Sequence, residues 1–237
     1  MEIIVDRRRV HVYTGSRAFN PAQPTVVFVH GAAQDHSVFA LQSRYFAWHG
    51  RNVLAVDLPG HGRSDGEPLP AVEAIADWLA ALAAAAGVAA AAFVGHSLGA
   101  LAVLECAARH PQCVARLALL GPAVPMTVSD DLLAAARDDE ATAFAMIVAW
   151  SFNPVNALAS NPSPGMSMTG NAMRLLQRSR RGTLATDLRA CNDYARGIEA
   201  ARAVRAPVLV VLGERDQMAP PKATPPLIAA LADAHVV

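Results

Sequence analysis

The chain has 237 residues, of which 53% are hydrophobic and 17% charged, and its 20 basic side chains balance its 20 acidic ones. This length accommodates one α/β domain with a substantial core and a small inserted subdomain. The balanced charge offers no surface for polyanions, so we expect no nucleic-acid partner. The three cysteines form no Cys-x-x-Cys pair, which excludes a zinc site of that pattern and fits a reducing compartment.

No segment has the pattern of a targeting or membrane-spanning sequence. The apolar residues 3–5 are flanked by charges, which leaves no room for the hydrophobic region of a signal peptide. The alanine-rich stretch 78–94 is divided by Gly87, a pattern that favours a core helix followed by a buried strand. We therefore expect a cytoplasmic protein without a membrane partner.

Strands and helices are predicted to alternate through the first half of the chain. Runs of β-branched residues bounded by turns predict strands, and longer apolar patterns that end at glycine or proline predict helices. In chain order these are a hairpin (3–5 and 10–13), a strand (25–29), a helix (38–49), a strand (52–56), a helix (71–86), a strand ending near 94, a helix (97–109) and a strand (114–120). The alternation predicts an α/β fold with a mostly parallel sheet, flanking helices and right-handed crossovers.

The pattern changes between Gly121 and about Arg205, where helices are predicted without strands. The predicted helices cover 130–137, 140–152, 171–181 and 184–201, with a proline- and glycine-rich connection at 153–170. A strand at 208–212 then resumes the sheet. We assign residues 122–205 to an inserted helical cap and residues 1–121 and 206–237 to the core.

Ser97 lies in the local sequence of a nucleophile elbow. It is the serine of a Gly-x-Ser-x-Gly motif, Gly95 to Gly99, which follows a predicted strand and precedes a predicted helix. Such a turn exposes the serine hydroxyl and needs small residues two positions to either side. The backbone N–H of Leu98 stands at the start of the helix, where it can donate to an oxyanion. The preceding His96 is expected to pack beneath the turn.

A second turn follows the strand at 25–29. Here Gly31 and the small residues after it let the backbone bend toward the nucleophile, so the N–H of Ala32 is the predicted second oxyanion donor. Residues 57–64 contain glycines but lack the third glycine of a dinucleotide-binding loop, and no phosphate-binding P-loop motif occurs. No nucleotide site is therefore predicted there.

Four motifs together resemble the α/β-hydrolase fold family. In the family's order they are Val-Phe-Val-His-Gly-Ala-Ala (27–33), Asp-Leu-Pro-Gly-His-Gly-Arg-Ser (57–64), the elbow (95–99) and Gly-Glu-Arg-Asp-Gln-Met-Ala-Pro (213–220). The resemblance implies a fold with a helical cap, His30 as a residue that fixes its turn, and Asp216 as the acid that orients a catalytic histidine. Asp65, Asp130 and Asp131 are weaker candidates for the acid.

The catalytic histidine is the component that this sequence does not supply. In the chain order Ser, Asp, His the base follows Asp216, and His235 is the one histidine there. Residues 234–237 have the pattern of the start of a strand, whereas the family carries its histidine in a loop after that strand. We therefore expect the base beyond Val237, and expect residues 1–237 alone to have negligible activity.

These residues predict a serine hydrolase that cleaves a carboxylic ester, lactone or similar small acyl substrate through an acyl-enzyme, with no metal or organic cofactor. A serine nucleophile disfavours the family branches that use aspartate. A cofactor-free perhydrolase, a C–C bond hydrolase and a non-catalytic binder of small ligands remain alternatives. Apolar side chains of the cap either line an acyl pocket or belong to an ordinary core: Met146, Trp150, Phe152 and Met166.

Overall fold

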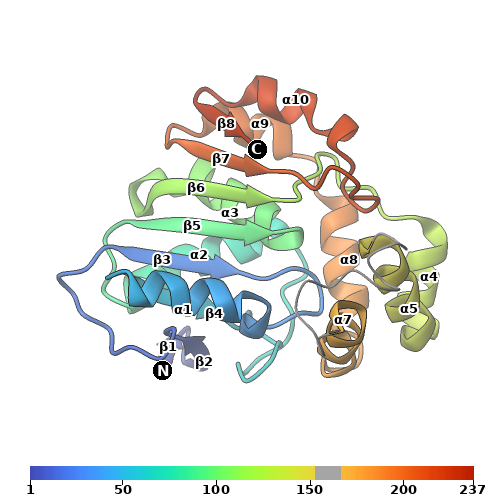
Figure 1. The fold of residues 1–237 in the computed structure, drawn as a ribbon, viewed down its shortest axis with the longest axis horizontal. Helices are drawn as coiled ribbons and strands as arrows, with labels where there is room; N and C mark the ends of the chain where they lie inside the picture. The colour runs from blue at the N-terminus through green and yellow to red at the C-terminus, as the bar shows by residue number, and fades with distance from the viewer. Residues whose placement is uncertain (153–166) are drawn as a thin grey trace.

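A single mixed sheet organises the chain, in the order β1-β2-β4-β3-β5-β6-β7-β8 (Figure 1). The computed structural model describes residues 1–152 and 167–237. The strands are β1 (Glu2–Val5), β2 (Arg8–Tyr13), β3 (Thr25–Val29), β4 (Asn52–Val56), β5 (Ala91–His96), β6 (Val114–Leu120), β7 (Val208–Val211) and β8 (Ala234–Val236). The hairpin β1–β2 is antiparallel and β2 pairs antiparallel with β4, while all other pairs are parallel. The predicted fold class is thus confirmed.

Helices cover the two faces of the sheet unequally. Helix α1 (Ala40–Trp48) lies on one face, and α2 (Val72–Ala85), α3 (Leu98–Arg109), α9 (Gly197–Ala203) and α10 (Pro225–Ala230) lie on the other (Figure 1). The larger hydrophobic cluster lies beneath α2, α3 and α9. Strands β3 and β4 are buried at every residue, whereas inward and half-exposed residues alternate along β5. The sheet is therefore enclosed on both faces only at β3 and β4.

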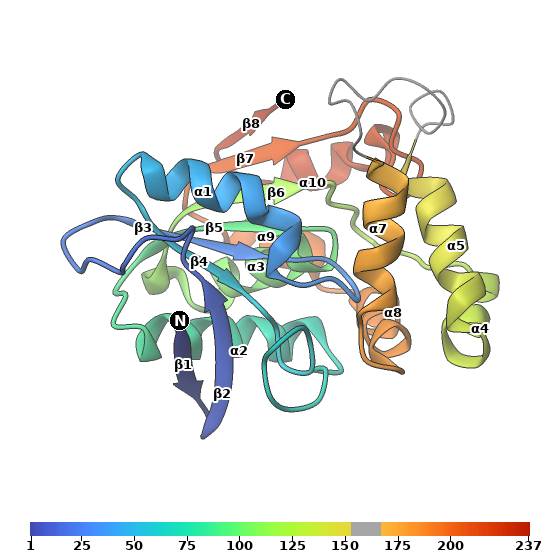
Figure 2. The same ribbon diagram turned by 60° about the horizontal axis from the view of Figure 1, so that its bottom comes forward.

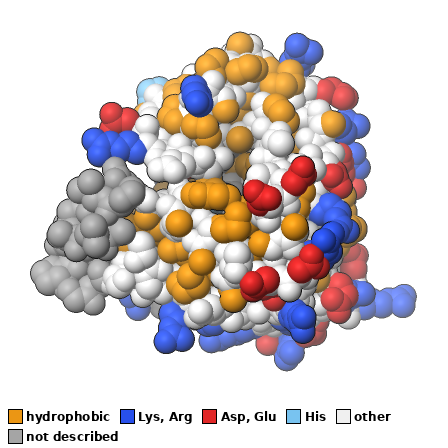
Figure 3. Space-filling model, turned by 90° about the vertical axis from the view of Figure 1, so that its right-hand side faces the viewer, with side chains coloured by type: hydrophobic (Ala, Val, Ile, Leu, Met, Phe, Trp, Pro, Cys, Tyr) orange, Lys and Arg blue, Asp and Glu red, His pale blue; other side chains and the backbone are white. Residues whose placement is uncertain are grey.

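Among the described residues, four further helices gather beyond the carboxyl ends of the strands: α4 (Asp130–Asp138), α5 (Glu140–Ser151), α7 (Met168–Gln177) and α8 (Thr183–Asp193) (Figure 2). They enclose a separate cluster of buried residues that includes Leu132, Phe144 and Leu184. On this side of the molecule, hydrophobic side chains occupy the middle of the surface and charges of both signs lie around it (Figure 3). None of the described helices is both long and apolar enough to span a membrane.

The prediction of one helix over 184–201 is wrong. The chain leaves the helical conformation at Tyr194, whose ψ is 106°. Its phenolic O–H donates to the buried Glu105 of α3 at 2.7 Å. This contact separates α8 from α9, which lies within the predicted cap range but packs against α3 and α10.

Candidate active site

Ser97 occupies a strained turn between β5 and α3. Its φ is 54° and its ψ is −118°, a region that non-glycine residues rarely adopt. Its N–H donates to the carbonyl of Leu120 at the end of β6, at 3.0 Å. The turn therefore presents the serine at the carboxyl edge of the sheet, where ligands bind in open α/β sheets.

The glycines of the elbow are required by close backbone contacts. A Cβ on Gly95 would collide with the carbonyl oxygen of Gly99. A Cβ on Gly99 would collide with the carbonyl oxygen of Val29 and lie 2.7 Å from that of His30. Neither glycine has a positive φ, so their role is to leave space between β5, α3 and β3.

The turn after β3 lies directly against the elbow. A Cβ on Gly31 would lie 3.3 Å from the Cβ of Ser97 and 3.1 Å from Nδ1 of His96. Within the described residues, neither the N–H of Ala32 nor that of Leu98 donates to a protein acceptor. Both predicted oxyanion donors therefore remain free near Ser97.

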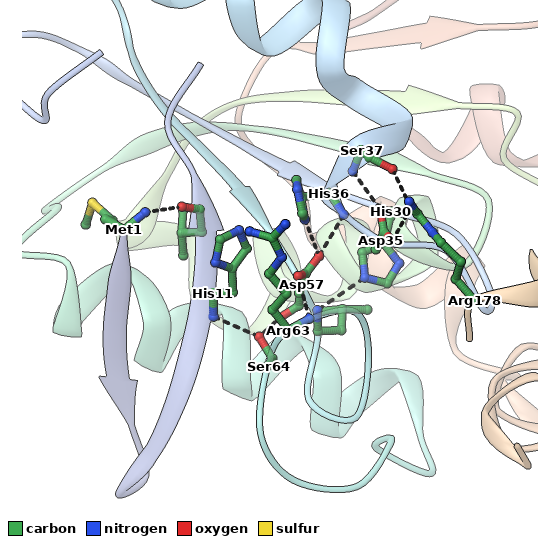
Figure 4. A network of polar contacts seen from close by, with 12 residues as sticks. Met1, His11, His30, Asp35, His36, Ser37, Asp57, Arg63, Ser64 and Arg178 are labelled. Atoms are coloured by element: carbon green, nitrogen blue, oxygen red, sulfur yellow. Dashed lines mark hydrogen bonds and ion pairs between the residues drawn. The ribbon is translucent and has the colours of Figure 1, made fainter. Parts of the chain in front are cut away.

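Two histidines, the buried His30 and the half-buried His96, lie at these turns. The imidazole of His30, labelled in Figure 4, accepts the N–H of Leu58 at Nε2, at 3.2 Å. Its Nδ1 donates to the carbonyl of Gly31 at 2.8 Å. Complete burial lowers the pKa of His30 to about 4, so the ring is neutral at pH 7. Burial also lowers the pKa of His96, whose Nδ1 is enclosed beside Gly31. Both nitrogens of the His30 ring are thus engaged, so this ring is not free to act as a base toward substrate.

Asp216 approaches the same edge of the sheet from the loop after β7. Its Oδ1 accepts the N–H groups of Met218 and Ala219 at 2.8 and 2.9 Å. Its Oδ2 would lie 3.5 Å from a Cβ placed on Gly121, the residue that follows the Leu120 acceptor of Ser97. The structure thus brings the loop of Asp216 to the strand end beside the elbow.

The other acid candidates have local roles. Asp65 pairs with Arg9 on the surface at 3.4 Å. Asp130 and Asp131 lie in the first turn of α4, where carboxylates stabilise the positive end of the helix dipole.

His235 lies far from the elbow. Across the sheet, His235 of β8 pairs with Leu209 of β7, which pairs with Ala118 of β6, and Ala118 in turn pairs with Val94 of β5. It is therefore three strands away from β5, which corresponds to about 14 Å at the usual strand spacing. This separation agrees with the expectation that His235 does not serve as the base.

Sequence reasoning missed a buried ion pair between α8 and the turn at 57–64. Asp187 of α8 accepts the Nε2–H of His61 at 2.8 Å, and the same oxygen accepts the N–H of Ala33 at 2.8 Å. The side chains of Asp187 and His61 are only 1% and 2% exposed. The presence of His61 in the turn at 57–64 was visible in the sequence, but its partner is 126 residues away.

One group in the described part of the chain has the donor atoms of a metal site, His11, His36 and Asp57, with those atoms within 4.8 Å of one another. Hydrogen bonds already engage the Asp57 carboxylate, since Oδ1 accepts from the N–H and Nδ1 of His36 and Oδ2 accepts from the N–H of Arg63 (Figure 4). These hydrogen bonds satisfy the buried Asp57 carboxylate, which connects the turns that contain His36 and Arg63.

Two of the four apolar residues considered for an acyl pocket share a hydrophobic cluster with the turn after β3. Met146 and Trp150 are half-buried against the cluster that also includes Ala32 and Ala33. Phe152 is half-buried at the end of α5, and Met166 lies outside the described residues. The role of these side chains as an acyl pocket stays a prediction.

The α/β hydrolase fold family model matches residues 24–237. Among curated proteins, the pimeloyl-[acyl-carrier protein] methyl ester esterase of Chromobacterium violaceum is 41% identical over 108 residues, and a putative non-heme haloperoxidase of Mycobacterium phage D29 is 33% identical over 108 residues. These alignments cover 46% and 45% of this chain but only 40% and 39% of the relatives.

Solved structures match over the whole chain at lower identity. The enol-lactonase of Burkholderia xenovorans superposes with a TM-score of 0.86 and 23% identity, covering 100% of this chain and 90% of that one. A hydrolase of Pseudomonas aeruginosa gives 0.84 and 20%, covering 100% and 88%. These structures share the fold, and the family match extends over most of the sequence. The chain therefore belongs to the α/β hydrolase fold family.

Proposed function

We propose that this protein is a serine hydrolase that cleaves a carboxylic ester, lactone or similar small acyl substrate through an acyl-enzyme. The observation that carries the proposal is the strained Ser97 beside the Gly31 turn, together with the N–H groups of Ala32 and Leu98, which have no acceptor among the described residues. A nucleophile beside two donors is the arrangement that acyl transfer requires. The names of the relatives, a methyl ester esterase and an enol-lactonase, support this substrate class.

In the proposed reaction, Ser97 Oγ attacks the acyl carbonyl while its proton passes to a histidine base. The N–H groups of Ala32 and Leu98 hold the oxyanion of the tetrahedral intermediate. The histidine returns the proton to the leaving alcohol as the C–O bond breaks, which leaves the acyl group on Ser97. Water then adds to the acyl-enzyme with the same histidine as base, and releases the acid.

Asp216 orients that histidine in the proposal and stabilises its positive charge. The proposal does not assign the base to His235, because the register of β8 keeps His235 away from Ser97. Chemical rescue can replace a missing imidazole, since free imidazole can occupy the space beside Asp216 and accept the serine proton.

The test measures hydrolysis of p-nitrophenyl butyrate by residues 1–237 across a series of imidazole concentrations, and by any natural form that continues beyond Val237. Ser97→Ala is the matched control and subtracts hydrolysis by imidazole alone. We expect turnover that depends on Ser97, with a butyryl group located on Ser97 by mass spectrometry. Ligand-induced stabilisation without Ser97-dependent turnover in either form would overturn the proposal in favour of a binding protein.

A peroxide-using activity is the second candidate, favoured by the relative named as a putative non-heme haloperoxidase. Hydrogen peroxide in place of water would attack the same acyl-enzyme and release a peracid. Peracid formation from a short acyl ester and peroxide, compared with hydrolysis in the same preparation, distinguishes the two activities.

A further inference from the structure

Asp187 connects the cap to the loop that carries a predicted oxyanion donor. It belongs to α8 of the cap, yet its Oδ2 accepts the N–H of Ala33 in the core at 2.8 Å, across 154 residues of sequence. Ala33 itself has a φ of 54°, which is unfavourable for a residue with a Cβ. A buried, charged acceptor is well suited to hold such a conformation because hydrogen bonds to charged groups are the stronger ones.

The hydrogen bonds of this loop leave one N–H available. The N–H of Gly31 donates to the side-chain oxygen of Gln34 at 3.1 Å, and the N–H of Gln34 donates to the carbonyl oxygen of Gly31 at 3.2 Å. The N–H of Ala33 is taken by Asp187. Among the described residues only the N–H of Ala32 remains without an acceptor in this turn, and this turn packs against Ser97.

His61 neutralises the charge of Asp187. Burial alone would lower the pKa of His61, but the Asp187 carboxylate at 2.8 Å raises it, with Asp57 contributing in the same direction. The other ring that faces His61 is His30, at 4.8 Å between centroids. Without His61, the carboxylate of Asp187 would have no charged partner. It would still accept the N–H of Ala33, next to the Ala32 donor, and its charge would repel the negative charge of an oxyanion.

We propose that Asp187, paired with His61, is a positioning residue that holds the Gly31–Gln34 loop from the cap and keeps the Ala32 N–H directed at the reacting carbonyl. This inference rests on the proposed hydrolase function. Under this proposal, the cap contributes to stabilisation of the oxyanion in addition to covering the substrate.

The experiment compares Asp187→Ala, Asp187→Asn and Arg178→Ala in the form that shows Ser97-dependent hydrolysis. Arg178 of the cap is the matched control because it also ties cap to core, through Asp35 at 2.7 Å and Ser37 at 3.0 Å, without touching the loop (Figure 4). For each variant kcat and KM are measured, together with the rate of phosphonylation of Ser97 and the hydrogen exchange of amides 32–34. Circular dichroism and urea unfolding determine the folded fraction.

We expect Asp187→Ala to lower kcat by about 100-fold, near the lower bound for loss of one oxyanion donor, with KM changed less than about 3-fold. Phosphonylation should slow in parallel, because the phosphoryl oxygen occupies the same donors. Asp187→Asn should fall between this variant and wild type, since its amide oxygen still accepts the Ala33 N–H. Amide exchange at 32–34 should accelerate in Asp187→Ala and stay unchanged in Arg178→Ala.

An equal loss of kcat in Arg178→Ala would overturn the inference, because general cap attachment would then explain the effect. Asp187 variants that lose stability but retain kcat per folded molecule would overturn it as well. Absence of Ser97-dependent turnover in wild type would instead refute the proposed function. In that case hydrogen exchange still decides whether Asp187 holds the loop, and unchanged exchange in Asp187→Ala would refute the holding role.

Discussion

The two sides of the candidate site are held in different ways. On the acid side, which is the turn of the proposed acid, Asp216 is half-buried and its carboxylate accepts hydrogen bonds from the N–H groups of Met218 and Ala219, two and three residues away. On the oxyanion side, the Ala33 N–H is fixed by a carboxylate 154 residues away, and that carboxylate is buried with His61. The acid side is thus a local turn, whereas the oxyanion side, the turn of the proposed donor Ala32, depends on contacts with α8 and with the turn at 57–64.

Because of this difference, substitutions on the two sides should differ in how they affect catalytic activity and the free energy of unfolding. A side chain held by its own loop can be changed with little effect on folding, because few packed groups depend on it. A buried, charged group shared by several elements stabilises the fold and the site together, and its loss leaves partners unsatisfied. Variants on the acid side are therefore expected to affect activity alone, while variants on the oxyanion side are expected to affect both.

The sharpest test of this comparison is Asp216→Asn. We expect a loss of kcat of about 10³- to 10⁴-fold, because the amide no longer holds the catalytic histidine in its productive tautomer. The free energy of unfolding should change by less than about 0.5 kcal/mol. Steady-state kinetics and urea unfolding measure the two quantities, with Asp65→Asn as the surface control. A large loss of stability in Asp216→Asn would remove the distinction between the two sides.

Gly99→Ala tests the junction of the elbow and the oxyanion side. The new Cβ meets the carbonyl oxygens of Val29 and His30, so we expect a loss of about 3 kcal/mol in unfolding free energy. Gly87→Ala is the control, because Gly87 has a φ of 68° with no atom within 4 Å of the added Cβ. It should cost about 1 kcal/mol through backbone strain alone. Equal costs for the two variants would show that the close contact is unimportant.

Acidification should weaken the oxyanion side through His30. Its folded-state pKa of about 4 lies below the unfolded value of 6.5, so the unfolded state binds more protons between these values. Stability from this group is therefore full above pH 6.5 and is lost as the pH falls toward 4, by about 2 kcal/mol at pH 5. Urea unfolding at pH 7 and pH 5 should show a larger loss in wild type than in His30→Gln. The exposed His49 supplies the control His49→Gln, which should match wild type, and equal losses in all three proteins would contradict the assignment.

Alkaline pH should act on the same region in the opposite direction. The pKa of His61 is raised in the folded state, so its contribution is full below the unfolded value of 6.5 and is lost as the pH rises through the folded value. Unfolding measured from pH 6 to pH 9 should show this decline in wild type and not in His61→Gln. A decline of the same size in His61→Gln would assign it to another group.

Local sequence determined much of the fold. The hairpin, the helices before and after the elbow and the β6 strand lie where apolar patterns and breaker residues predicted them. Helix α7 begins at Met168, three residues before its predicted start. The break at Tyr194 was not predicted, because the contact of its hydroxyl with Glu105 joins residues 89 positions apart.

The elbow at Ser97 and the acid loop at Asp216 could be recognised from the sequence because short-range backbone geometry defines them. Glycines mark the elbow, and the bonds of Asp216 lie within three residues. Only the tertiary structure placed Asp187 beside Ala33 and His61. No periodicity along one segment encodes that meeting, since α8, the turn at 57–64 and the turn at 31–34 come together only when the chain folds. The physical reason is that a buried ion pair depends on which surfaces exclude water together, and that is a property of the folded chain.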